Sequence, residues 1–193
     1  MERAHIRCIP FNPVVPLISL VMNHRDHRKI VVIDGTVAYT GGVNLADEYI
    51  NAEQRFGYWK DAALRVEGDA AWNFTAMFLN FWNAFRPSET DYDAFRPMPL
   101  VPPVSDGIVQ PYADSPLDEE PMAETVYLNI LAQAQRYVYI YTPYLAVGEE
   151  MLDALKNAAK RGVDIRLVLP GIPDKKLVFR LSRSYYLPLL RAG

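Results

Sequence analysis

The sequence has one cysteine, few histidines and no long hydrophobic run, and each shortage excludes a class of protein. Among 193 residues the single cysteine is Cys8, so no disulfide can form within the chain. The best candidate for a membrane span, residues 11–22, falls short of the roughly 18 to 20 apolar residues required and is interrupted by two prolines. A formal net charge of -3 argues against a nucleic-acid binder, and no such partner is expected. The composition that remains is 50% hydrophobic, enough to bury a core.

The stretch around which the chain is organised begins at His27. Residues 30–33 are four apolar, mostly β-branched residues typical of a buried strand, and Asp34-Gly35 is a strong hairpin signal. If these two residues form the whole loop, Ile33 pairs with Thr36, Lys29 with Thr40 and His27 with Gly42. This register predicts that His27 and Lys29 share one face of the hairpin, beside residues 41–44.

The groups that this hairpin assembles suit a phosphate. A neutral imidazole at His27 is a competent nucleophile near neutral pH. The Lys29 ammonium, the Asn44 amide and the backbone N–H groups of Gly41 and Gly42 can hold the phosphate oxygens as charge develops. Attack on a phosphodiester by these groups requires no metal or cofactor, and we expect none. A lone His-x-Lys is more often structural, but the complete spacing favours chemistry, whereas His5 and His24 fall outside the spacing and are interpreted as structural.

The spacing His27-x-Lys29-x4-Asp34-x6-Gly41-Gly42-x-Asn44 resembles the motif of the phospholipase D superfamily. Further stretches are similar to the bacterial cardiolipin synthases of that superfamily: GGVNLADEYIN, GYWKDAALRVEG, IYTPYL and AAKRGVDIRLVLPGIPDKKL. The resemblance covers nearly the whole chain. It implies a phosphatidyltransferase in which a histidine attacks phosphatidylglycerol, glycerol leaves, and a second phosphatidylglycerol accepts the phosphatidyl group to give cardiolipin.

The resemblance also implies roles for individual residues. The catalytic positions of the motif are His27, Lys29 and Asp34, and the phosphate would be bound by Lys29, Asn44, Gly41 and Gly42. Since the predicted hairpin puts Asp34 at the opposite end from His27, about 17 to 20 Å away at roughly 3.3 Å per residue, we assign Asp34 a turn or structural ion-pair role.

Two further positions have both a functional and a structural interpretation. Asp61 begins a predicted strand over residues 59–66, where a carboxylate in related enzymes orients the nucleophilic histidine; an exposed acid at a strand end is the structural alternative. Tyr144 follows a predicted strand at its carboxyl end, where ligands approach α/β sheets, and could line the lipid headgroup site. Its alternative is an aromatic side chain that covers the core. Asn44 is also predicted to cap a helix over residues 45–51.

The resemblance implies an α/β fold with a phospholipase D-like mixed sheet flanked by helices, incomplete relative to a two-motif enzyme. Residues 1–86 would be the C-terminal part of one phospholipase D-like half, with the motif. A proline-rich linker over 87–107 would lead to the N-terminal part of a second half at 108–193. There, a strand at 137–142, a helix at 148–161 and a strand at 163–169 predict parallel neighbouring strands.

Two-motif relatives use one histidine as nucleophile and the other as acid, and this sequence has one motif. We therefore interpret the chain as an internal fragment whose partners are phosphatidylglycerol, the rest of the parent chain or a second copy in a homodimer, and a membrane surface. The parent protein is expected at the bacterial cytoplasmic membrane, on its cytoplasmic side, with the fragment itself soluble. Basic residues of a final helix from Lys175 could meet that membrane or simply face solvent. The alternatives are another phosphodiesterase of the superfamily, a phospholipase or a nuclease, and a catalytically silent interaction module.

Overall fold

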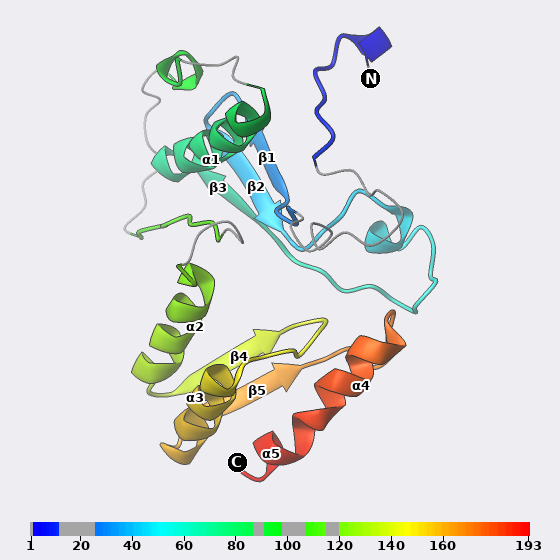
Figure 1. Ribbon diagram of the computed structural model, residues 1–193, viewed down its shortest axis with the longest axis vertical. Helices are drawn as coiled ribbons and strands as arrows, with labels where there is room; N and C mark the ends of the chain where they lie inside the picture. Colours follow the sequence, from blue (N-terminus) through cyan, green and yellow to red (C-terminus); the bar gives the residue numbers. More distant parts are fainter. Residues whose placement is uncertain (1, 12–25, 87–90, 98–106, 115–119) are drawn as a thin grey trace. The chain divides into compact units, whose positions relative to one another are not determined.

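The computed structural model describes residues 2–11, 26–86, 91–97, 107–114 and 120–193 (Figure 1). The chain divides into two compact units. The first comprises residues 1–52 and 59–118, and the second comprises residues 53–58 and 119–193. His24, interpreted as structural from the sequence, lies outside the described residues, as do residues 12–22 of the candidate membrane span and much of the proline-rich linker.

The first unit is a three-stranded antiparallel sheet covered by one long helix. The strands β1 (Ile30–Ile33), β2 (Val37–Gly41) and β3 (Ala63–Glu67) lie in the order β1-β2-β3. The helix α1 (Asp69–Phe85) packs across one face of this sheet (Figure 1). The described part of this unit also contains the short 3-10 turns η1 (Glu2–Ala4), η3 (Asp47–Ile50) and η4 (Asp93–Phe95). The expected strand over residues 59–66 therefore begins only at Ala63, and Asp61 precedes it.

Alternation along the strands explains why α1 covers only one face. Ala38, Ala71 and Phe74 are buried between the sheet and the helix, and Ile30 and Val32 pack against them. The side chains between these positions point to the other face, where Val31, Ile33 and Tyr39 are exposed.

The predicted hairpin register is wrong by one residue. Ile33 pairs with Val37 and Val32 with Ala38, so the loop has three residues, 34–36. Asp34 and Gly35 both have left-handed φ, 52° and 66°, as this dipeptide signals. The N–H of Thr36 donates to Ile33 O at 3.1 Å, but its carbonyl accepts a hydrogen bond from Gly68 beyond β3. Thr36 therefore belongs to the turn.

The second unit confirms the predicted parallel pair. The strands β4 (Tyr137–Tyr141) and β5 (Asp164–Val168) pair in parallel, with Tyr137 opposite Asp164. The helix α3 (Glu149–Lys160) connects them, and α2 (Met122–Gln133) precedes them. The chain ends in α4 (Lys176–Ser184) and the short α5 (Tyr186–Leu190). The α/β class is thus confirmed, with antiparallel and parallel pairing in two separate sheets of the described residues.

Packing in the core of the second unit predicts that truncating one leucine will strongly lower the free energy of unfolding. Leu131 is 1% exposed and packs with Leu155, Ala158 and Val163. We expect Leu131→Ala to lower the free energy of unfolding by about 2 to 5 kcal/mol, because a cavity replaces the lost contacts. Urea denaturation measures this change in the free energy of unfolding. Leu190→Ala, at a position 76% exposed, is the matched control, and an equal loss in both variants would contradict this core assignment.

Candidate functional site

His27 and Lys29 lie together just before β1, as the motif spacing predicts. The Lys29 ammonium donates to the ring nitrogen Nε2 of His27 and to the His27 carbonyl oxygen, at 2.8 Å each. His27 is exposed and Lys29 is half-buried. An imidazole and a cation are therefore in direct contact at a position that a ligand can reach.

This contact assigns a role to each ring nitrogen. With the ammonium as donor, Nε2 is the acceptor, and the tautomer compatible with the contact has its proton on Nδ1. A lone pair that accepts a hydrogen bond is not free to attack phosphorus. Attack by Nε2 therefore requires the Lys29 ammonium to move onto another acceptor, and a non-bridging phosphate oxygen is a suitable one.

The surroundings act on Lys29 in two opposing ways. Burial lowers its pKa because it disfavours the charged ammonium, and the negative charges of Asp26 and Asp61 partly oppose this by favouring the ammonium. The net result is a pKa below the ordinary value for lysine. Two carboxylates from different parts of the first unit therefore favour the charged form of Lys29 against the effect of its burial.

Asp26 and Arg28 hold the segment that carries the pair. The Arg28 side chain donates to both carboxylate oxygens of Asp26, at 2.8 and 3.1 Å, and its guanidinium lies 4.9 Å from the Phe81 ring centroid on α1. Burial raises the pKa of the Asp26 carboxyl, but the hydrogen bonds and charge of Arg28 outweigh it, so the pKa lies below its usual value. A bidentate ion pair stacked on a core helix limits the freedom of residues 26–29.

The two motif glycines lie against the segment that contains Asp61. Gly41 pairs with Ala63, and the N–H of Gly42 donates to Ala62 O at 3.1 Å. A Cβ on Gly41 would overlap the Ala62 carbonyl, and one on Gly42 would overlap the Asp61 carboxylate. The close approach of the Ala62 backbone therefore excludes a side chain at Gly41, whereas a side chain at Gly42 would require the Asp61 carboxylate to move. Both reasons are separate from phosphate binding.

Asp61 has its own partners. Its carboxylate accepts hydrogen bonds from the Ala62 N–H at 2.7 Å and from the Trp59 indole at 3.3 Å. Among the described residues it has no hydrogen bond with His27, so the expected orienting role stays a prediction. The described contribution of Asp61 is its negative charge near Lys29.

The negative charge of Asp61 predicts how its removal would change the pKa of Lys29. Asp61→Asn should lower the pKa of Lys29 further, because the variant removes a negative charge that favours the ammonium. Titration of the Lys29 side chain by NMR measures the change. Asp69→Asn, at the start of α1, removes a carboxylate that does not contribute to the field at Lys29 and serves as control. An unchanged or raised pKa of Lys29 in the Asp61 variant would show that this field has been misassigned.

Asn44 follows the glycines, and its side chain is engaged in a way the sequence did not predict. Its amide nitrogen donates to the Tyr49 hydroxyl, and the Tyr49 ring packs on Trp59 with centroids 4.7 Å apart. Asn51 accepts from the Trp59 N–H at 2.6 Å and donates to the Trp59 carbonyl at 2.9 Å. This connected set supports both Asn44 and the Asp61 segment.

The helix-capping role expected for Asn44 is wrong. The turn η3 begins at Asp47 with Ala46 at its N-cap, and no side chain caps it. The Asn44 amide is used by Tyr49 instead. Its convergence with Lys29 on a phosphate stays a prediction. The sequence did not identify Tyr49, Asn51 and Trp59 as residues that support the site. Its only signal was the spacing of Trp59 and Asp61, which are two residues apart in an extended segment.

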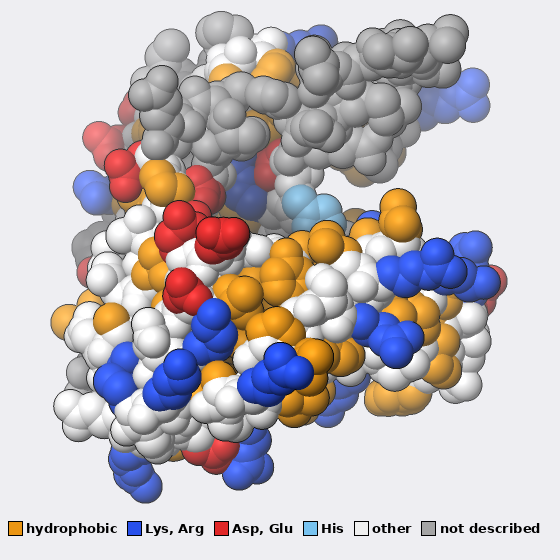
Figure 2. All heavy atoms as spheres, turned by 60° about the horizontal axis from the view of Figure 1, so that its bottom comes forward, with side chains coloured by type: hydrophobic (Ala, Val, Ile, Leu, Met, Phe, Trp, Pro, Cys, Tyr) orange, Lys and Arg blue, Asp and Glu red, His pale blue; other side chains and the backbone are white. Residues whose placement is uncertain are grey.

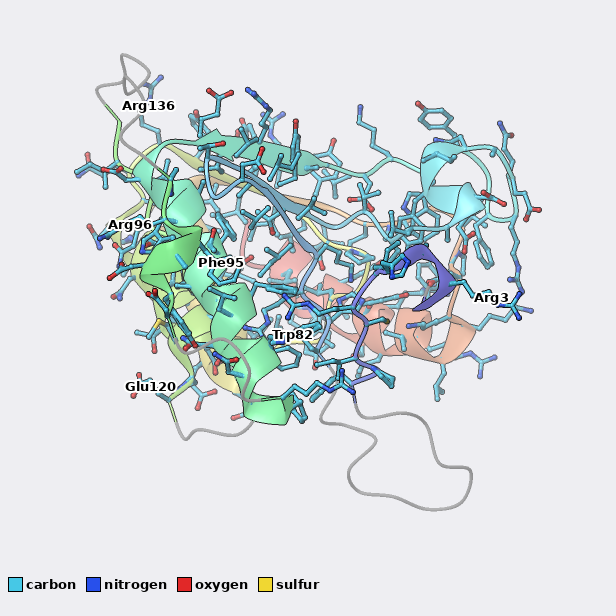
Figure 3. All side chains as sticks on the ribbon, turned by 90° about the horizontal axis from the view of Figure 1, so that it is seen from above. Arg3, Trp82, Phe95, Arg96, Glu120 and Arg136 are labelled. Atoms are coloured by element: carbon cyan, nitrogen blue, oxygen red, sulfur yellow. The ribbon has the colours of Figure 1, made fainter. Side chains whose placement is uncertain are left out.

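Asp34 lies in the turn, at the other end of β1 from Lys29, as its assigned turn role requires. With Gly35 it borders a cavity of about 720 Å³ within the first unit. The other walls come from β1, α1 and the loop around η4, and include Trp82, Phe95 and Arg96, which can be followed in Figure 3. His27 and Lys29 do not line this cavity. The motif aspartate is thus separated from the imidazole and the ammonium.

Tyr144 belongs to the second unit, in the loop after β4. Its hydroxyl donates to the Asp174 carboxylate, and the Lys175 ammonium lies 4.9 Å from the ring centroid. The side chain is half-buried at the carboxyl end of the parallel strands. The headgroup-lining role of Tyr144 stays a prediction.

Two features are absent from the described residues. In that part of the chain no helix has the length and apolarity to cross a membrane. The same residues contain no group of three or more His, Cys, Asp or Glu side chains arranged to hold a metal ion.

Comparison with known proteins adds the evidence of relatives. Residues 127–193 match the family model described as "Cardiolipin synthase, PLD-like domain". Over its whole length the chain is 49% identical to an uncharacterized protein of Streptococcus mutans, of which it spans 42%. It is also 38% identical to cardiolipin synthases of Halalkalibacterium halodurans and Geobacillus thermodenitrificans, and it spans 39% of each. The chain thus spans about two fifths of the length of these relatives.

Proposed function

Because this chain belongs to the phospholipase D-like family of cardiolipin synthases, we propose that it carries the nucleophilic half of a phosphatidyltransferase site. The substrate class is phosphatidylglycerol, and His27 is the group that attacks. The observation that supports this most directly is the Lys29 ammonium on Nε2 of His27, at 2.8 Å. It pairs a nucleophile with the cation that a phosphate diester requires.

The proposed reaction has two steps. A substrate phosphate draws the Lys29 ammonium onto a non-bridging oxygen, and the freed Nε2 forms a bond to phosphorus while the bond to the glycerol oxygen breaks. The glycerol takes a proton from a general acid as it leaves. The hydroxyl of a second phosphatidylglycerol then attacks phosphorus and gives its proton to the conjugate base of that acid, while the bond between phosphorus and Nε2 breaks. This step forms cardiolipin and restores the free imidazole. The Asn44 amide and the N–H groups at Gly41 and Gly42 are proposed to hold the same phosphate.

The general acid must come from outside this motif. The sequence contains one His-x-Lys-x4-Asp, so we propose that a second histidine comes from another part of a longer chain or from a second copy across a two-fold axis. The chain alone is then expected to transfer the phosphatidyl group from phosphatidylglycerol weakly or not at all. We place the complete enzyme at the bacterial cytoplasmic membrane, where both of its lipid substrates are found.

A substrate that needs no general acid isolates the proposed role of His27. In phosphatidyl-p-nitrophenol the leaving group departs as a stable anion, so the missing acid is no obstacle. Mixed with the 193-residue chain in detergent micelles, it should release nitrophenolate in a burst approaching one equivalent per chain. The expected adduct is a phosphatidyl group on His27, identified by mass spectrometry at neutral pH.

The product formed after the burst distinguishes the alternatives. Cardiolipin formed on adding phosphatidylglycerol supports transfer, and phosphatidic acid alone would indicate a hydrolase. EDTA should leave the burst unchanged, because no metal takes part in the proposed steps. A chain that forms no adduct with this activated lipid would contradict a nucleophilic role and support the catalytically silent alternative.

A further inference from the structure

The last two helices have one side fixed on the second unit. Ser182 on α4 is 2% exposed, and its hydroxyl accepts from the Leu145 N–H and donates to Val178 O. Between the helices, the Tyr185 hydroxyl donates to Val147 O at 3.1 Å. Leu189 on α5 packs against the core cluster of this unit. The orientation of the segment on its own unit is therefore set by buried contacts.

The opposite side combines exposed leucines with positive charge. Four leucines are well exposed: Leu177 at 79%, Leu181 at 47%, Leu187 at 55% and Leu190 at 76%. Five cationic residues are exposed on the same segment: Lys175, Lys176, Arg180, Arg183 and Arg191. No acidic residue follows Asp174, whereas the rest of the chain carries the other 15 cations and all 23 acids. Figure 2 shows Lys and Arg side chains next to hydrophobic ones on the face turned to the viewer.

The helix α3 of the same unit shows what an ordinary solvated helix looks like here. It carries charges of both signs, Lys156 forms an ion pair with Asp153 at 2.6 Å, and Leu155 is buried. The segment from Lys175 to Arg191 differs in both respects, because its charge has one sign and its leucines face outward. Hydration alone explains neither feature.

We infer that the outward side of α4 and α5 docks on an anionic phospholipid bilayer. Cations near such a surface gain from its negative potential, and leucines beside them gain by entering the boundary between headgroups and acyl chains. The long Lys and Arg side chains can reach phosphates while the leucines go deeper. A nucleic-acid backbone would use the charge but leave the leucines in water. This inference does not depend on catalysis at His27.

Binding of the complete 193-residue chain to vesicles tests the inference. The chain should sediment with vesicles of equal parts phosphatidylglycerol and phosphatidylcholine and remain in solution with phosphatidylcholine alone. Each cation contributes about fivefold in affinity, so the double variant R180Q/R183Q should lose about 25-fold. L177S/L181S should lose about tenfold, since apolar burial is removed. The matched control is Lys160→Gln at the exposed end of α3, which should bind as the native chain does.

Each other outcome overturns the inference. Equal binding to neutral vesicles would exclude a charge-selective surface, and full binding by either double variant would place the contact elsewhere. Binding of a single-stranded oligonucleotide that the leucine changes do not affect would reassign the charge to nucleic acid. Circular dichroism checks that each variant is folded. The native chain should also lose binding at high salt, which tests the role of charge without any substitution. His27→Ala should bind vesicles normally, which separates this test from that of the proposed function.

Discussion

Replacing His27 by Ala is expected to abolish the nitrophenolate burst and the phosphatidyl adduct in the 193-residue chain. Among the described residues, the imidazole is the only group hydrogen-bonded to Lys29 that can form a bond to phosphorus. Without it, the ammonium can still bind the phosphate but has no nucleophile to assist. The rate of adduct formation should fall by about 10⁴-fold or more, as for other nucleophile knockouts.

The control for His27→Ala uses another histidine of the same unit. His5 is exposed and has no place in the motif spacing, so His5→Ala should leave the burst intact. Both variants should also bind the micelles equally, which is checked by sedimentation. A burst of normal size in the His27 variant, or its loss in the His5 variant, would move the nucleophile to another residue.

The hairpin shows which part of a site a sequence can specify. The i, i+2 spacing put His27 and Lys29 on one face, and the structure has them in contact at 2.8 Å. The dipeptide at 34–35 predicted a hairpin turn, and both residues have the positive φ that such a turn uses. The register was wrong because the signal does not say how many residues the loop holds. That number depends on Thr36, whose carbonyl is used by Gly68, far along the sequence.

Contacts far along the sequence also limited the predictions for Asn44 and for the strand expected over residues 59–66, which begins only at Ala63. A local rule predicted Asn44 as a helix cap, but its amide instead contacts Tyr49, and the placement of that tyrosine depends on packing against Trp59. In contrast, β4, α3 and β5 were predicted to within one or two residues at each end. Each of those elements is long enough to show its own hydrophobic pattern, and short turns mark its ends.

Replacing Lys29 by Arg is the second change with a large expected effect, because it keeps the charge and alters only its geometry. The ammonium is a compact donor that contacts both Nε2 and the carbonyl oxygen of His27, at 2.8 Å each. A planar guanidinium spreads its donors over a fork and cannot make both contacts from one atom. It would either remain on the imidazole or miss the phosphate oxygens as charge develops.

We expect Lys29→Arg and Lys29→Met to slow adduct formation by about 10² to 10³-fold, the scale of losing one preorganised donor to a developing oxyanion. The loss should appear in the rate at saturating lipid more than in the lipid concentration that gives half-saturation, because the contact strengthens in the transition state. Lys60→Arg, at an exposed lysine of the same unit, is the matched control. If Lys29→Arg reacts at the native rate while Lys29→Met does not, charge alone is sufficient and the geometric role of the ammonium is wrong.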